Sequence, residues 1–132
     1  MRKICYLSLL AAVVFTSCQD NKSFKKGKQG IEYKIISGNG SEKVKPGEFM
    51  QLHVGQYYST QRRDSLLSDT RTTGGPYMEA LDSASTPPQY YEILSQLKKG
   101  DSLVLRIPID SAFAKSPMNM PPWMKKGNFL TT

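Results

Sequence analysis

Residues 86–109 read TPPQYYEILSQLKKGDSLVLRIPI, and this stretch decides the fold that the sequence predicts. Its first residues are typical of a helix start, because Thr86 can cap the helix, Pro87 suits the first helical position and Gln89 completes a capping box. Large side chains then recur at i, i+3, i+4 and i+7, on one helical face: Tyr90, Ile93, Leu94 and Leu97. We therefore expect one short helix from near Pro87 to near Lys99.

A strand is predicted directly after this helix. Gly100 favours a helix end, because glycine adopts the left-handed conformation that closes many helices. Beyond it, large apolar residues recur at every second position, which is the pattern of a strand: Leu103, Leu105, Ile107 and Ile109. Pro108 lies near the end of this strand.

The rest of the chain carries strand patterns and long loops. Strands are predicted at 31–36, 49–58, 76–81 and 129–132, and Gly55 within the second of them suggests a bulge. Residues 59–75 form a polar excursion with room for a short strand, and 111–126 is a proline-containing loop. Few helices, with no regular strand–helix alternation, argue against a doubly wound parallel sheet. The predicted fold class is α+β, an antiparallel β-sheet wrapped on one short α-helix.

The last predicted strand is short. It begins at Phe129 and reaches only Thr132, whereas strands usually have about five or six residues. No turn signal follows Leu130, so we expect the sequence to be a piece of a longer protein in which this strand continues. The alternative is that another chain completes the domain.

The first 17 residues have the pattern of a signal peptide. Arg2 and Lys3 give a positive start, and residues 4–15 form an apolar run with Ser8 as its only polar side chain. A run of this length is typical of a signal peptide and short for a spanning helix. We assign 1–17 to a leader, whose removal would lower the formal charge of +7 by two, to +5.

The leader ends in residues 15–18, FTSC, which resemble a bacterial lipobox. The resemblance implies that Cys18 is lipidated and becomes the mature N-terminus, anchored in a membrane. A plain signal peptide cut elsewhere, or a membrane anchor, is the alternative. Residues 18–29 would then be the lipidated cysteine and a flexible polar tether, although its four lysines could instead form a patch for anionic headgroups or nucleic acid. The remaining residues, 30–132, form one globular domain.

Composition and motifs exclude several kinds of chemistry. The chain is 39% hydrophobic and 22% charged, as in an ordinary globular domain. One histidine and two cysteines do not supply a standard tetrahedral zinc site, and no nucleotide-binding glycine motif or nucleophile elbow occurs. The single His53 is best interpreted as structural, and Asp64 and Asp69 as solvated loop residues rather than an acid–base pair. We predict neither a cofactor nor a metal.

Short motifs follow one another in a fixed order through residues 30–132. They are GIEYKII at 30–36, KPGE at 45–48, LHVG at 52–55, LSQLKKGDS at 94–102, LRIP at 105–108 leading to Phe113-Ala114, MPP at 120–122, and Leu130. Their order and spacing resemble those of the FKBP-type peptidyl-prolyl cis-trans isomerases. The resemblance implies an FKBP-like fold over this whole part of the chain.

The same resemblance implies a shallow pocket lined by aromatic side chains. The family's pocket positions fall on Val54, Asp64, Tyr77, Tyr90 and Phe113, with Met78 as an alternative to Tyr77 and Tyr57 or Tyr58 as a substitute for Val54. Three positions depart from the family, because Arg63 replaces a phenylalanine, Phe113 lacks a tyrosine hydroxyl and Thr132 replaces the last pocket phenylalanine. Tyr90 has two interpretations of equal weight, the floor of the pocket and a residue of the core.

The function implied by the resemblance is peptidyl-prolyl isomerisation that assists the folding of exported proteins. The substrates would be proline-containing polypeptides, without cofactor, metal or nucleic acid. The lipid anchor on Cys18 would hold the protein in the cell envelope outside the cytoplasm, where we expect the outer membrane. One alternative is an FKBP-like binding or chaperone module with little or no isomerase activity. Another is an unrelated β-rich envelope lipoprotein.

Overall fold

The computed structural model describes residues 23–114 and 118–132. The predicted leader and Cys18 lie outside the described residues. The elements, in chain order, are β1 (Lys25–Lys26), the 3-10 turn η1 (Lys28–Gly30), β2 (Glu32–Ile36), β3 (Phe49–Leu52), β4 (Gly55–Ser59), β5 (Asp64–Asp69), β6 (Tyr77–Ala80), α1 (Pro88–Leu94), β7 (Ser102–Pro108), α2 (Ile109–Phe113) and β8 (Phe129–Thr131).

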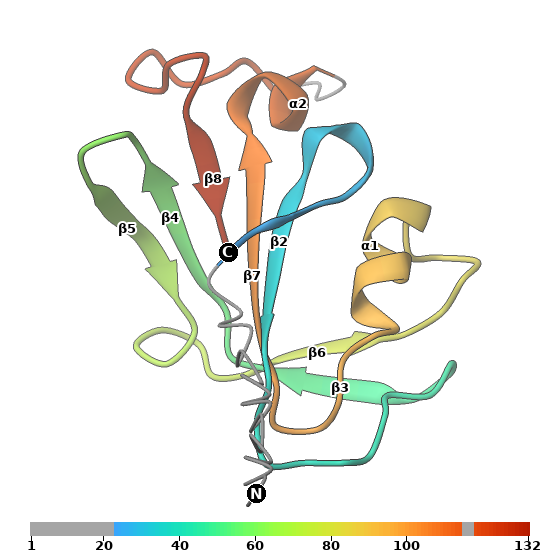
Figure 1. The fold of residues 1–132 in the computed structure, drawn as a ribbon. Helices are drawn as coiled ribbons and strands as arrows, with labels where there is room; N and C mark the ends of the chain where they lie inside the picture. Colours follow the sequence, from blue (N-terminus) through green and yellow to red (C-terminus); the bar gives the residue numbers. More distant parts are fainter. Residues whose placement is uncertain (1–22, 115–117) are drawn as a thin grey trace, which may run out of the picture.

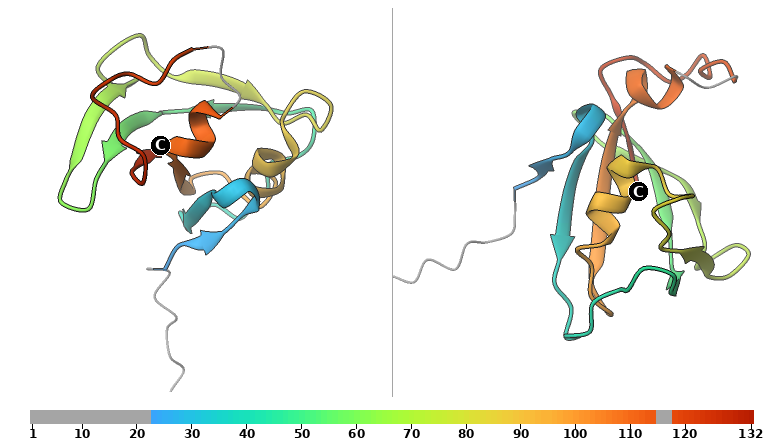
Figure 2. Two further views of the ribbon diagram at one scale, coloured as in Figure 1. Left: turned by 90° about the horizontal axis from the view of Figure 1, so that it is seen from above. Right: turned by 90° about the vertical axis from the view of Figure 1, so that its right-hand side faces the viewer.

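Two antiparallel sheets form the framework. The larger sheet has six strands in the order β1-β2-β7-β8-β4-β5, and the smaller one pairs β3 with β6. Figure 1 shows the small sheet crossing one end of the large sheet, and α1 lying beside β2 and β7. The two further views in Figure 2 place α1 against one face of the large sheet. The predicted α+β class, an antiparallel sheet with one short main helix, is confirmed.

Helix α1 is shorter than predicted and starts differently. Pro87 precedes another proline and is extended (φ −54°, ψ 138°), so the helix begins at Pro88, with no side-chain cap. The predicted capping role of Thr86 is wrong, because its Oγ1 atom is buried without a hydrogen-bond partner in the described part of the chain.

The helix also ends at Leu94 instead of near Lys99. The backbone beyond it bonds to a distant segment: the Leu97 carbonyl accepts from the Val44 N–H at 3.1 Å, and the Lys99 N–H donates to the Glu42 carbonyl at 2.9 Å. Because their backbone groups bond to residues 42–44, residues 97–99 cannot continue the helix.

The single strand predicted at 49–58 is two strands in different sheets. Strand β3 pairs with β6, whereas β4 pairs with β5 and β8. The chain turns at Val54, whose N–H donates to Thr70 Oγ1 at 2.9 Å and whose carbonyl accepts the Thr70 N–H at 3.0 Å. The register shift of β4 against β5 lies between Gln56 and Tyr57, one residue beyond the glycine that suggested a bulge.

The segment predicted to be a flexible tether contains regular structure. The predicted tether 18–29 includes β1, which pairs with β2, and the start of η1, so the folded part begins before residue 30. The Arg106 guanidinium lies over the Phe24 and Phe129 rings, at 5.0 and 4.3 Å from their centroids, and so joins this segment to the sheet.

Helix α2 replaces the end of the strand predicted through Ile109 and the start of the loop predicted from Ser111. Pro108 is extended, and Ile109 turns inward and is fully buried at the first position of the helix. The predicted excursion 59–75 contains β5, and the strand predicted from Phe129 is confirmed as β8, between β7 and β4.

The core lies between α1, α2 and the two sheets. Its buried apolar members come from both ends of the sequence and from all layers: Ile31, Met50, Leu81, Ile93, Leu97, Ile109 and Met124. None of the described helices is both long enough and apolar enough to cross a bilayer.

Candidate binding cavity between α1 and the sheet

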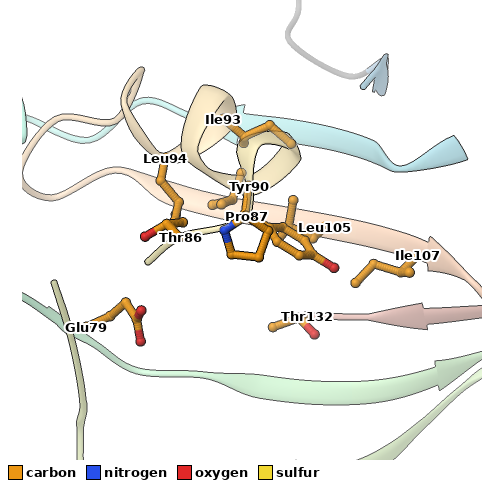
Figure 3. Close-up of a pocket in the computed structure, with 10 residues that line it drawn as sticks. Glu79, Thr86, Pro87, Tyr90, Ile93, Leu94, Leu105, Ile107 and Thr132 are labelled. Atoms are coloured by element: carbon orange, nitrogen blue, oxygen red, sulfur yellow. The ribbon is translucent and has the colours of Figure 1, made fainter. Parts of the chain in front are cut away.

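A cavity of about 290 Å³ lies between α1 and the large sheet, with the small sheet at one side (Figure 3). Its lining comes from β6, the segment that leads into α1, α1 itself, β7 and the residue after β8: Glu79, Thr86, Pro87, Tyr90, Ile93, Leu94, Leu103, Leu105, Ile107 and Thr132. Most of these side chains are apolar, so the cavity suits an apolar group of a ligand that is transferred into it from water.

Periodicity explains how β7 and α1 supply this lining. Alternate residues of a strand point to one face, and the cavity is lined by Leu103, Leu105 and Ile107 of β7. Tyr90, at the first full turn of α1, faces the same space from the helix. The pair Leu105 and Thr132 exchange backbone hydrogen bonds of 2.8 Å in both directions, which seats Thr132 beside Leu105.

Tyr90 combines an apolar ring with a phenol that stays protonated. Burial raises the pKa of the Tyr90 phenol above its ordinary value of 10.0. Figure 3 shows the ring extending from α1 toward the end of the cavity where Ile107 and Thr132 lie. The half-buried Tyr90 is therefore a wall of this cavity and brings a hydroxyl donor to it.

Two other polar groups lie toward the opposite end of the cavity. Thr86 is 7% exposed, and its hydroxyl is buried without a partner among the described residues. Glu79, on β6, brings the one charged side chain of the ten lining residues. Buried hydroxyls are nearly always hydrogen-bonded in folded proteins, but a ligand can complete the bonding of Thr86 only after this side chain shifts, because its Oγ1 atom is not accessible from the cavity.

The structure brings one of the five predicted pocket residues into this cavity. Tyr90 lines it, whereas Val54 lies at the turn between β3 and β4 and Asp64 is exposed at the start of β5. Tyr77 is 55% exposed on β6, and Phe113 is half-buried at the end of α2. Thr132, the position of the last family phenylalanine, does line the cavity.

The proposed acid–base alternative for two aspartates is not supported by their positions. Asp64 and Asp69 occupy opposite ends of β5. Asp69 Oδ1 accepts the Arg71 N–H at 2.8 Å, and the Asp69 carbonyl accepts the N–H groups of Thr72 and Thr73. Asp69 thus organises a turn. The described residues hold no group of three or more acidic, histidine or cysteine side chains placed to bind a metal ion.

Sequence reasoning missed most of the cavity lining. The alternation in β7 and the helical spacing of Tyr90 and Leu94 identified inward-facing residues, but the same pattern describes a filled core. Glu79 carried no distinguishing signal, and Thr86 was assigned to capping. A buried hydroxyl without a partner is visible only once the surrounding chain is in place.

No protein-family model and no curated protein matches the chain. Among solved structures the chain is similar to FkpA from Escherichia coli, with a TM-score of 0.53 and 21% sequence identity. The similarity covers 85% of this chain and 49% of the FkpA chain, so the chain spans about half the length of that protein. This likeness supports an FKBP-like fold, and it assigns no functional role to any residue of this chain.

Proposed function

We propose that the protein is a peptidyl-prolyl cis-trans isomerase of the FKBP type, acting on proline-containing polypeptides without a cofactor. One observation carries the proposal: an FKBP-like sheet and helix enclose an apolar cavity walled by Tyr90 and by alternate residues of β7. The similarity to FkpA, an FKBP-type isomerase, supports the same reaction class.

The chemistry of this reaction fits a cavity without an acid–base pair. A prolyl bond rotates slowly because rotation breaks the amide resonance. The twisted amide is less polar than the planar one, so a water-excluding cavity shaped for the twisted form lowers the barrier by differential binding. The Tyr90 hydroxyl can donate a hydrogen bond to a carbonyl of the bound chain.

The cellular setting is part of the proposal and rests on the sequence. The leader 1–17 and the lipobox-like FTSC motif support export and lipidation at Cys18, with attachment in the cell envelope, in the outer membrane by our expectation. The substrates would then be exported proteins during folding. Mass spectrometry of the mature protein tests this directly, because an unmodified Cys18 would exclude the lipid anchor.

A binding or chaperone module with little isomerase activity is the second candidate. The positions of Asp64 and Phe113 outside the cavity lining favour it, since the family pocket residues they match would then not act together. A chain of this kind would bind prolyl peptides without accelerating their rotation.

An isomerisation assay of the full chain on a proline-containing peptide separates these candidates. We expect measurable catalysis, and a Tyr90→Ala loss of about tenfold or more, which corresponds to about 1.4 kcal/mol of lost transition-state stabilisation. Tyr91→Ala is the matched control, because Tyr91 is the next residue of α1 and is not part of the cavity lining. Binding without catalysis would support the module, and equal losses in the two variants would contradict the assignment of the cavity.

A further inference from the structure

Glu79 places a carboxylate on the wall of an otherwise mainly apolar cavity. It lies on β6, where it pairs directly with Met50 of β3. Direct cross-strand neighbours share a face of a sheet, and Met50 is 7% exposed, so both side chains are on the inner face of the small sheet. Figure 3 shows Glu79 across the cavity from α1, toward the end where Thr86 and Leu94 lie.

Within the described part of the chain, no lysine or arginine forms an ion pair with the Glu79 carboxylate. Within residues 23–114 and 118–132, no hydrogen bond or ion pair involves this side chain. A ligand that fills the cavity removes water from an unpaired carboxylate, which is unfavourable unless the ligand supplies a positive charge or hydrogen-bond donors. Glu79 therefore disfavours a purely apolar occupant and favours a cationic one.

Thr86 adds a second requirement toward the same end of the cavity. Its buried Oγ1 has no partner among the described residues, and a hydroxyl can donate to a carbonyl. A polypeptide segment with a lysine or arginine offers an ammonium or guanidinium to Glu79, and it offers a backbone carbonyl to Thr86 once that side chain shifts to expose its hydroxyl.

We propose that Glu79 determines substrate choice, so that the cavity prefers polypeptides with a lysine or arginine directly beside the proline. This inference rests on the proposed prolyl-peptide binding at the same cavity. The preference acts at contact distance, since the chain as a whole carries a formal charge of +7 and repels cationic peptides at longer range.

Peptides that differ in one charge test the inference. Each carries lysine or Nε-acetyl-lysine either directly before or directly after the proline, so that length is kept and only the charge is removed. Both kcat/KM for isomerisation and the Kd for binding are measured on the full chain. We expect lysine to be preferred about fivefold in at least one position, the upper range for a partly exposed ion pair.

Matched variants assign the preference to one residue. Glu79→Gln keeps the side-chain shape and should abolish the preference. Glu42→Gln changes the net charge equally, but Glu42 is exposed outside the cavity lining, so this variant should keep the preference. Thr86→Val should weaken the binding of the lysine and acetyl-lysine peptides to the same extent, because the Thr86 hydroxyl does not distinguish a charged side chain from a neutral one.

The outcomes separate this inference from the proposed function. Isomerisation without a lysine preference, or a preference that survives Glu79→Gln, overturns the inference and leaves the isomerase proposal standing. A Glu79-dependent preference in Kd without catalysis supports the inference and overturns the isomerase proposal. If no peptide binds and none is isomerised, both fail.

Discussion

The two sheets build opposite walls of the cavity and are packed very differently. The large sheet supplies β7, which is flanked by β2 and β8 and covered by α1, and the buried Ile109 follows it directly. The small sheet has only two strands, and its outer face carries Phe49 and Met78, which are 74% and 57% exposed. The cavity therefore has one wall held by many neighbours and one wall, bearing Glu79, held by few.

This contrast connects stability with selectivity. A two-stranded pair depends on packing for its stability, and here only the face with Met50 and Glu79 is packed. Binding sites often combine a rigid scaffold with a less stable element that adapts to the ligand. The apolar wall on β7 and α1 would bind the prolyl ring of the substrate. Glu79, on the wall formed by β6, would select the residue next to the proline.

The largest expected effect comes from truncating one apolar residue near each wall. Ile109→Ala should lower the free energy of unfolding by about 2–5 kcal/mol, because it leaves a cavity at a fully buried position. Phe49→Ala, at an exposed position of β3, should cost less than about 1 kcal/mol. Urea denaturation measures both. Equal costs would contradict the burial of Ile109 and the exposure of Phe49 on which this contrast rests.

Amide hydrogen exchange compares the walls without mutation. The paired amides of β2 and β7, which lie inside the large sheet, should exchange only on global or near-global unfolding. Paired amides of β3 and β6 should exchange at least about tenfold faster, a difference of about 1.4 kcal/mol in opening free energy. The reverse order would contradict the assignment of the weaker wall.

Thr86→Val sharpens the comparison at the point where the walls approach each other. Valine has nearly the same shape and removes a buried hydroxyl that has no partner in the described structure, so the free energy of unfolding should rise by about 1 kcal/mol. Thermal unfolding measures this change, and Thr60→Val, at a hydroxyl that donates to the Arg63 carbonyl, is a control that should destabilise. A lower melting temperature for Thr86→Val would mean that this hydroxyl is satisfied in solution.

The smallest effect is expected at alkaline pH. The folded state raises the pKa of Tyr90 above the unfolded value of about 10, so it binds the phenol proton more tightly than the unfolded state does. The associated stability is fully present below pH 10 and is lost as the pH rises through the folded pKa. Tyr90→Phe should therefore show a slightly flatter fall of stability above pH 10 than the wild type. Parallel curves would contradict the burial of this phenol.

Local patterns predicted some elements and not their limits. The alternation in β7 and the i, i+3, i+4, i+7 spacing in α1 are properties of short segments, and both elements exist where they were expected. The end of α1 depends on hydrogen bonds from Leu97 and Lys99 to residues 42–44, which are more than 50 positions away. The break at Val54 depends likewise on Thr70.

The sequence alone determined the fold class and the inward faces of α1 and β7, because period and residue type act within a few neighbours. Its resemblance to the FKBP family made Tyr90 a candidate wall. Only the tertiary structure decided which inward-facing residues border a cavity and which fill the core. It placed Glu79 opposite α1 and left the Thr86 hydroxyl without a partner among residues 23–114 and 118–132, while Val54, Asp64, Tyr77 and Phe113 lie outside the cavity lining. The physical reason is that a cavity is the space left between packed elements, and the distances between elements are set by the whole chain and not by any segment of it.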